Sequence, residues 1–137
     1  MRASQTISHP PDRIFAFLSD LHNHWRLGDA FVEVGDVRED GGGIVVRGPL
    51  GIARAARTVV VETAPDTLIR GRAEIGTSTV GYVAWVLEPD GAGTRVTLSA
   101  SVERASVRDR LLLALGGRRW LRRRFVRVLE QLEHSLA

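Results

Sequence analysis

The chain contains no cysteine and no lysine among its 137 residues. The absence of cysteine excludes a disulfide framework, a thiolate nucleophile and any cysteine-ligated zinc or iron–sulfur site. No stretch approaches the roughly 18 consecutive apolar residues of a membrane span, and residues 1–6 lack the apolar run of a signal peptide. We therefore expect a cytoplasmic protein whose stability comes from packing.

The remaining composition is that of an ordinary globular chain. Hydrophobic residues make up 44% and charged residues 26% of the sequence, which differs from the apolar-poor, charge-rich composition of disordered chains. A chain of this length is typical of one domain around one core. We expect a single domain over residues 1–137.

Positive charge is concentrated near the C-terminus. All 19 basic residues are arginine, and nine of them lie between Arg104 and Arg127, where Asp109 is the single acidic residue. The formal charge of the whole chain is only +3, so the rest of the chain is net acidic. The positive potential belongs to the C-terminal segment.

The N-terminal part predicts a strand followed by two short helices. Residues 3–8 are strand-like, and His9-Pro10-Pro11 ends the strand because proline lacks the ladder donor. Apolar residues then recur at helical spacing through residues 14–21. Residues 21–27 predict a second short helix that ends near Gly28.

The middle of the chain predicts an antiparallel meander. The predicted strands are residues 31–37, 44–47, 52–63, 68–75, 78–87 and 94–103, with the glycine-rich residues 39–43 expected as a loop. Connections this short force neighbouring strands to be antiparallel. In the last strand, alternation places Val96, Leu98, Ala100 and Val102 on one face.

The C-terminal residues 106–137 predict a helix. Ser106 is suited to cap it, and Gly116-Gly117 predicts a break or kink. Beyond the glycines an apolar stripe runs at spacings of three and four and consists of Leu121, Phe125, Val128, Leu129, Leu132 and Leu136. The helix therefore has one face suited to cover a sheet.

The order of these elements and several local motifs resemble the START-like (SRPBCC) superfamily, which contains polyketide cyclases/dehydrases and lipid-transport proteins. The motifs are the segment His-Pro-Pro-Asp-Arg-Ile-Phe-Ala-Phe-Leu-Ser-Asp at residues 9–20, the following Trp25, the corner Val-Glu-Thr-Ala-Pro at 61–65, the strand Val-Ala-Trp-Val-Leu-Glu-Pro at 83–89 with Gly-Thr-Arg-Val-Thr at 93–97, and the terminal helix.

This resemblance implies an α+β helix-grip fold, in which a curved antiparallel sheet of about seven strands wraps around a long C-terminal helix. It also implies a cavity between sheet and helix, because a bent sheet cannot pack uniformly on a straight helix. Small residues on four strands would leave room there, or would instead tune sheet curvature in a filled core; they are Ala53, Ala55, Gly71, Ala73, Gly81 and Ala100.

Seven residues are predicted to bind the ligand of such a cavity: Trp25, Phe31, Arg57, Trp85, Leu98, Leu121 and Phe125. The resemblance places Trp25 and Phe31 near the cavity mouth, and strand alternation turns Trp85 inward. For the aromatic residues, plain core packing is the alternative. For Arg57 the alternative, which we favour, is an exposed position or a salt bridge to an acid such as Glu74, because a buried guanidinium is costly without a carboxylate.

Metal binding and recognisable catalysis are not indicated. His22 and His24, with Asp20 and Asp29 nearby, do not share a helix face, so we expect surface histidines rather than metal ligands. No Gly-x-Ser-x-Gly segment is present. We predict no catalytic residue and no cofactor.

The leading hypothesis is a carrier or sensor of a small hydrophobic or amphipathic ligand. The first alternative is a cyclase/dehydratase-type enzyme acting on a polyketide-like carbonyl substrate. The second alternative is an interaction module that uses the arginine-rich helix face. That face is usually no more than a solvated surface; homodimer formation and peripheral membrane contact are weaker interpretations of it, and nucleic acid is disfavoured. Its residues are Arg119, Trp120, Arg123, Arg124 and Arg127.

Overall fold

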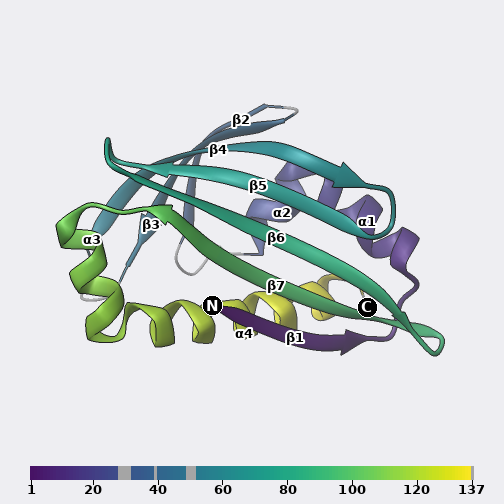
Figure 1. Cartoon of the computed structure of the whole chain (residues 1–137). Coiled ribbons are helices and arrows are strands. Elements are labelled where there is room, and N and C mark those ends of the chain that lie inside the picture. The colour runs from purple at the N-terminus through teal and green to yellow at the C-terminus, as the bar shows by residue number, and fades with distance from the viewer. Residues whose placement is uncertain (28–31, 39, 49–51, 137) are drawn as a thin grey trace.

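A computed structural model describes residues 1–27, 32–38, 40–48 and 52–136. In this part of the chain, seven antiparallel strands form one sheet in the order β1-β7-β6-β5-β4-β3-β2 (Figure 1). The strands are β1 (Arg2–Ile7), β2 (Val32–Val37), β3 (Gly41–Arg47), β4 (Ala53–Ala64), β5 (Leu68–Ile75), β6 (Thr79–Asp90) and β7 (Gly93–Arg104). The helices are α1 (Pro11–Ser19), α2 (Leu21–Arg26), α3 (Val107–Leu112), the π-helical turn η2 (Leu113–Gly117) and α4 (Arg118–Leu136).

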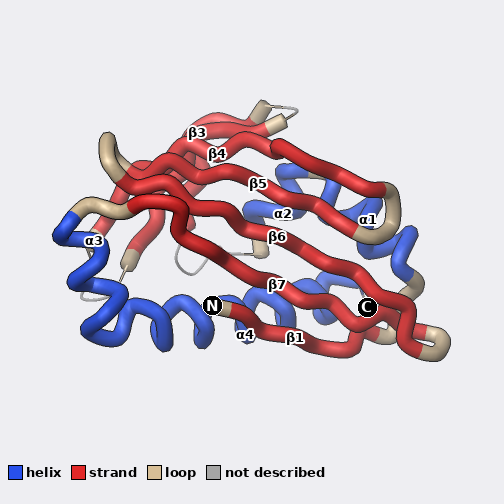
Figure 2. Tube along the Cα trace, viewed as in Figure 1, coloured by secondary structure: helices blue, strands red, loops and turns tan. Residues whose placement is uncertain are grey.

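The arrangement confirms the predicted α+β helix-grip fold. The sheet is strongly curved, α4 runs beside β1 and β7, and α1 and α2 lie behind the sheet in the view of Figure 2. Residues of α1 pack with the C-terminal part of α4 in one core. No described helix is long and apolar enough to cross a bilayer.

The hairpin of β6 and β7 confirms the predicted alternation at its centre. Trp85 is paired with Leu98, and both side chains are buried. Val96 is also fully buried, whereas Arg95 on the opposite face is exposed. Side chains of alternate residues leave a strand on opposite faces, so these positions fix which face of the sheet meets the helix.

The C-terminal half of α4 holds the main core. Its predicted stripe is buried at Phe125, Val128, Leu129, Leu132 and Leu136. These side chains pack with apolar residues of β1, α1, β6 and β7, among them Ile7, Ile14, Leu18, Leu87 and Val96. A smaller separate cluster at the other end of the sheet contains Val32, Ile44 and Ala56, with Trp25 packed against it.

The predicted break in the C-terminal helix is confirmed. Gly116 has a φ of 117°, a left-handed conformation that favours glycine, and Leu115 before it also leaves helical geometry. Ser106 caps α3 as expected, because its side chain accepts a hydrogen bond from the backbone N–H of Asp109 at 3.2 Å. The chain therefore forms an elbow, α3–η2, before α4 begins.

The expectation of a loop over residues 39–43 is wrong from residue 41 onward, because Gly41–Gly43 belong to β3. The glycines are needed for close strand contact rather than for a turn. A Cβ atom at Gly41 would lie 2.0 Å from the carbonyl oxygen of Thr58, and one at Gly42 would lie 2.0 Å from that of Asp36. β3 is thus pressed between β2 and β4 where side chains would not fit.

We predict that Gly42→Ala lowers the free energy of unfolding by about 2 kcal/mol or more, because the backbones of β2 and β3 must separate. Gly71→Ala is the matched control. Its Cβ would meet its nearest neighbour, the Val59 carbonyl oxygen, at an ordinary 3.5 Å. Urea unfolding measures both, and equal stability of the two variants would contradict the close-contact explanation.

Candidate functional site

A cavity of about 350 Å³ lies between the hollow of the sheet and the helices. Its wall is mostly apolar and is built by α2, by strands β2 to β7 and by the segment from α3 to α4. It separates the main core under the C-terminal half of α4 from the smaller cluster at β2, β3 and β4. The cavity is therefore the part of the hollow that the helix does not fill.

Five of the seven predicted ligand-binding residues line this cavity: Trp25, Trp85, Leu98, Leu121 and Phe125. They come from α2, β6, β7 and α4. Phe31 lies outside the described residues. Ligand contact by the five remains a proposal, whereas their common position around one cavity is a feature of the structure.

Arg57 does not line the cavity and is exposed on the outer face of β4. The inward positions of this strand are instead Arg54, Ala56, Thr58 and Val60. The structure therefore agrees with the favoured alternative, an exposed position for Arg57. Val59 and Val61 share the parity of Arg57, because β-branched side chains also suit the solvent side of a pleated sheet. The arginine on the cavity side is therefore Arg54.

The predicted small residues also fall into a group that lines the cavity and a group on the outer face of the sheet. Gly71, Ala73, Gly81 and Ala100 line the cavity, whereas Ala53 and Ala55 are exposed on β4. The four inward residues lie on β5, β6 and β7. Small side chains there leave space that larger ones would occupy.

His24 is not the surface loop residue expected from sequence: it lies within α2, is half-buried and lines the cavity. The Nε1–H group of Trp85 donates a hydrogen bond to His24 Nε2 at 3.2 Å. Nδ1 of His24 lies 3.3 Å from the carbonyl oxygen of Leu18. Because tryptophan only donates and a carbonyl only accepts, the neutral tautomer with hydrogen on Nδ1 satisfies both contacts.

Burial lowers the pKa of His24 to about 4, although the hydrogen bond to Leu18 opposes this effect. The ring is therefore neutral at neutral pH. Protonation would turn Nε2 into a donor facing the donor of Trp85 and would break that contact. His22, by contrast, is exposed, and no group of three potential metal ligands lies together in the described ranges.

A buried polar cluster closes the cavity wall where α3 meets the sheet. Arg54 of β4 faces Asp109 of α3 with two nitrogen atoms, one of them at 3.2 Å, and the hydroxyl of Thr79 also donates to Asp109. The backbone N–H of Ser106 donates to the Thr79 hydroxyl at 3.2 Å. These contacts attach α3 to β4 and β6.

The hydrogen bonds from Arg54 hold the pKa of Asp109 below its ordinary value, against burial, which raises it; Thr79 adds to the lowering. Sequence reasoning overlooked this cluster. Ser106 and Asp109 do have the spacing of a capping box, and Arg54 shares strand parity with Ala56, so signals for both positions were present in the sequence.

Trp120 is half-buried and lines the cavity, so its expected place on the exposed arginine-rich face is wrong. The guanidinium of Arg124 lies over its ring at 5.2 Å, as expected for a packed tryptophan covered by arginine. Arg119, Arg123 and Arg127 are exposed. The outer face of α4 is therefore cationic but lacks the predicted exposed aromatic ring.

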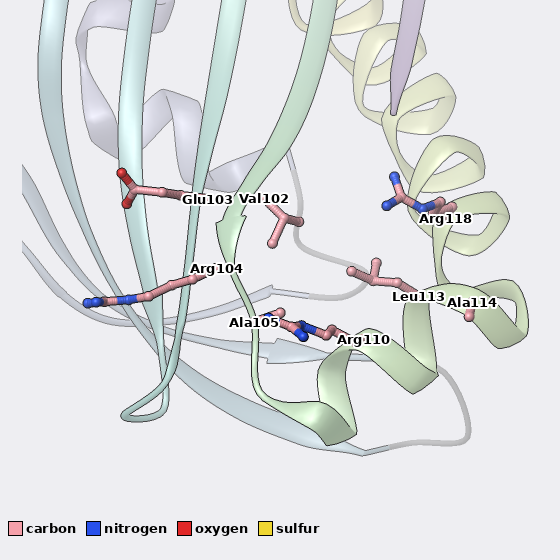
Figure 3. Close-up of a pocket in the computed structure, with 8 residues that line it drawn as sticks. All are labelled: Val102, Glu103, Arg104, Ala105, Arg110, Leu113, Ala114 and Arg118. Carbon is pink, nitrogen blue, oxygen red and sulfur yellow. The ribbon is translucent and has the colours of Figure 1, made fainter.

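A second hollow of about 290 Å³ lies at the elbow between the end of β7, α3 and the start of α4 (Figure 3). Arg110 and Arg118 contribute cationic groups to it, while Glu103 extends away on the far side of β7 in this view. Val102 and Leu113 line both this hollow and the large cavity. The elbow thus separates an apolar interior from a cationic exterior.

A family model described as polyketide cyclase / dehydrase and lipid transport matches residues 1–137. No curated protein matches the sequence. Among solved structures, TTHA0849 from Thermus thermophilus is 21% identical with a TM-score of 0.72, over 98% of this chain and 94% of that one.

Two further solved structures have the same fold. Ms6760 from Mycobacterium smegmatis is 15% identical with a TM-score of 0.72, over 99% of this chain and 89% of that one. DynU16, a protein in the dynemicin biosynthetic locus, is 18% identical with a TM-score of 0.60, over 99% of this chain and 46% of that one. At such identities the likeness establishes the fold alone.

The lowered pKa of His24 predicts an acid-sensitive fold. The unfolded chain takes up this proton near pH 6.5 and the folded chain only near 4, so stability is complete above 6.5 and falls towards 4. Since one pKa unit corresponds to about 1.36 kcal/mol, the loss reaches roughly 3 kcal/mol. Urea unfolding between pH 7 and 4 should show this slope in wild type and His22→Gln but not in His24→Gln. A slope retained by His24→Gln would refute the assignment.

Removal of the Asp109 carboxylate should destabilise the protein by about 3 kcal/mol, because Asp109→Ala leaves the Arg54 guanidinium half-buried without its partner. Glu33→Ala is the control, since it removes the partner of Arg47 in an exposed ion pair that is worth at most about 1 kcal/mol. Thermal and urea unfolding measure both. The contribution of Asp109 is present above its ordinary pKa of 3.8 and disappears on further acidification.

Proposed function

Because the chain belongs to the polyketide cyclase/dehydrase and lipid transport family, we propose that it binds a small hydrophobic or amphipathic ligand in the cavity between the sheet and α4, as a carrier or sensor. The observation that carries the proposal is the cavity itself, which has a volume of about 350 Å³ and a mostly apolar wall. This volume is at the smaller end of the range of ligand pockets, roughly 300–1,000 Å³.

Apolar contact supplies most of the binding free energy. A ligand that fills the cavity removes apolar surface of the half-buried lining residues Trp25, Trp120 and Leu121 from solvent, at about 25 cal/mol per Å² buried. Trp85 is held in one orientation by His24, so little side-chain freedom is lost when a ligand contacts it. Because the cavity wall is preformed, a ligand can bind without rearrangement of the core.

The polar cluster at α3 gives the cavity one polar end, which would orient an amphipathic ligand. A guanidinium carries five N–H donors, and Arg54 faces Asp109 with two nitrogen atoms, so the group retains donor capacity towards the cavity that it lines. An amphipathic ligand would place its polar end near Arg54 and Thr79. Its apolar end would lie against the tryptophans of α2 and β6.

The same contacts favour binding over the cyclase/dehydratase alternative. Both ring nitrogens of His24 are engaged, one by Trp85 and one by Leu18, so its neutral ring has no lone pair directed at a substrate. Asp109 accepts from Arg54 and Thr79, and its lowered pKa makes it a weak base. His24 and Asp109 therefore serve to hold Trp85 and Arg54 in place in the cavity wall.

Ligand binding should change the intrinsic fluorescence of the protein, because all three of its tryptophans line the cavity. The probe is N-phenyl-1-naphthylamine, an uncharged apolar dye that the arginine-rich surface does not attract. We expect a saturable quench of tryptophan emission with a matching rise in dye emission. Ala100→Leu, which extends a side chain into the cavity, should weaken dye binding by about tenfold or more, since a few buried CH₂ contacts at about 0.8 kcal/mol each are lost.

Ala55→Leu is the control for this experiment, because it adds the same atoms on the exposed face of β4. It should bind the dye as wild type does. Circular dichroism verifies that both variants are folded. Dye binding that does not saturate in folded protein, or that Ala100→Leu leaves unchanged, would overturn the proposed function. Turnover of a carbonyl substrate by the purified protein would instead favour the enzyme alternative.

A further inference from the structure

The elbow exposes three large apolar side chains on one face. Val107, Leu111 and Leu115 are 82%, 57% and 76% exposed. They recur every four residues along α3 and η2, so they lie one above another on the same side of the segment. Single exposed apolar residues are ordinary, but three that are adjacent on one helix face mark an interaction surface. We call these three residues the tip.

The opposite face of the same segment is already occupied. Leu112 and Leu113 line the cavity, and Asp109 is buried against Arg54. A rotation of α3 that turned the tip inward would bury arginine and release Asp109 from Arg54 and Thr79, so the tip is an outward face. The segment has two apolar faces, one towards the cavity and one towards the outside.

Arginines surround the tip. Arg108 and Arg110 flank it on α3, and Arg118, Arg119 and Arg122 follow at the start of α4, all of them exposed. The acidic residue within the segment, Asp109, is already paired with Arg54 and Thr79 in the polar cluster. Figure 1 shows α3 at one end of the molecule.

We propose that the tip docks on the surface of an anionic lipid bilayer. Apolar side chains projecting from a short helix can enter the boundary between headgroups and acyl chains. Arginines around them then meet anionic headgroups, and each contributes about 1 kcal/mol, or roughly fivefold, to partitioning near a negatively charged surface. An apolar tip surrounded by arginines therefore suits an anionic lipid surface better than a neutral one.

A second copy of this chain is a poorer occupant. In a two-fold symmetric contact each residue faces its equivalent region, so Arg108 and Arg110 of one copy would approach the same arginines of the other. Acidic residues to neutralise them are lacking in the segment between Arg104 and Arg127, apart from the paired Asp109. Like charges that face each other oppose association.

The experiment is co-sedimentation of the full chain with two kinds of vesicle: phosphatidylcholine alone, and equal parts of phosphatidylcholine and phosphatidylserine. We expect partitioning to the anionic vesicles to exceed that to the neutral ones by about tenfold or more at low salt, and to weaken as salt is added. Leu111→Gln with Leu115→Gln should reduce it by at least about tenfold without changing the formal charge.

The matched control is Val34→Gln with Val61→Gln, which changes two similarly apolar side chains, 45% and 46% exposed, on the sheet. It should bind vesicles as wild type does. The inference is overturned if both vesicles bind equally, if the control pair loses binding to the same extent, or if sedimentation velocity shows a dimer that the Leu111/Leu115 pair abolishes while vesicles remain unbound. Ala100→Leu should still bind vesicles, so failure of the cavity proposal is distinguishable from failure of this one.

Discussion

The structure depends on a mismatch in shape between a curved sheet and a straight helix. The C-terminal half of α4 packs closely on β1, α1 and β7, where Leu129 and Leu132 are almost completely buried. Towards its N-terminal end the sheet bends away, and a rigid helix cannot follow it. Close packing at one end therefore leaves an unfilled space at the other, and the small residues Gly71, Ala73 and Ala100 keep it open.

The open end requires its own closure, which the elbow provides. Gly116 lets the chain leave the axis of α4 in a left-handed conformation, and α3 then meets the sheet through Arg54, Thr79 and Asp109. A polar attachment of this kind is directional, because it is formed only in one register of the strand and the helix. The apolar core holds the far end of the molecule, whereas the near end is held by a few charged and hydroxyl groups.

The sequence predicted the elements better than the side chains that line the cavity. Periodicity identified the helices and strands and placed Trp85 and Leu98 inside, because strong alternation reports burial directly. It failed at Gly41–Gly43, where composition typical of loops serves close strand contact, and at β4, where valines on the outer face concealed the inward Arg54. It also missed His24, because its role depends on Trp85, 61 residues away, and no local pattern carries such a contact.

The elbow has side chains on the cavity wall and side chains on the outer surface of the molecule. Leu112 and Leu113 on its inner face contribute to the cavity wall, while Val107, Leu111 and Leu115 project outward only a helix diameter away. A ligand in the proposed site that packed against the inner face would stabilise the position of α3, and a partner on the outer face would act on the same short segment. If either event shifts α3 relative to the sheet, thermodynamic linkage requires that the other respond by the same factor. The ion pair of Arg54 and Asp109 makes that shift energetically costly, because moving α3 would leave both charged groups without their partners.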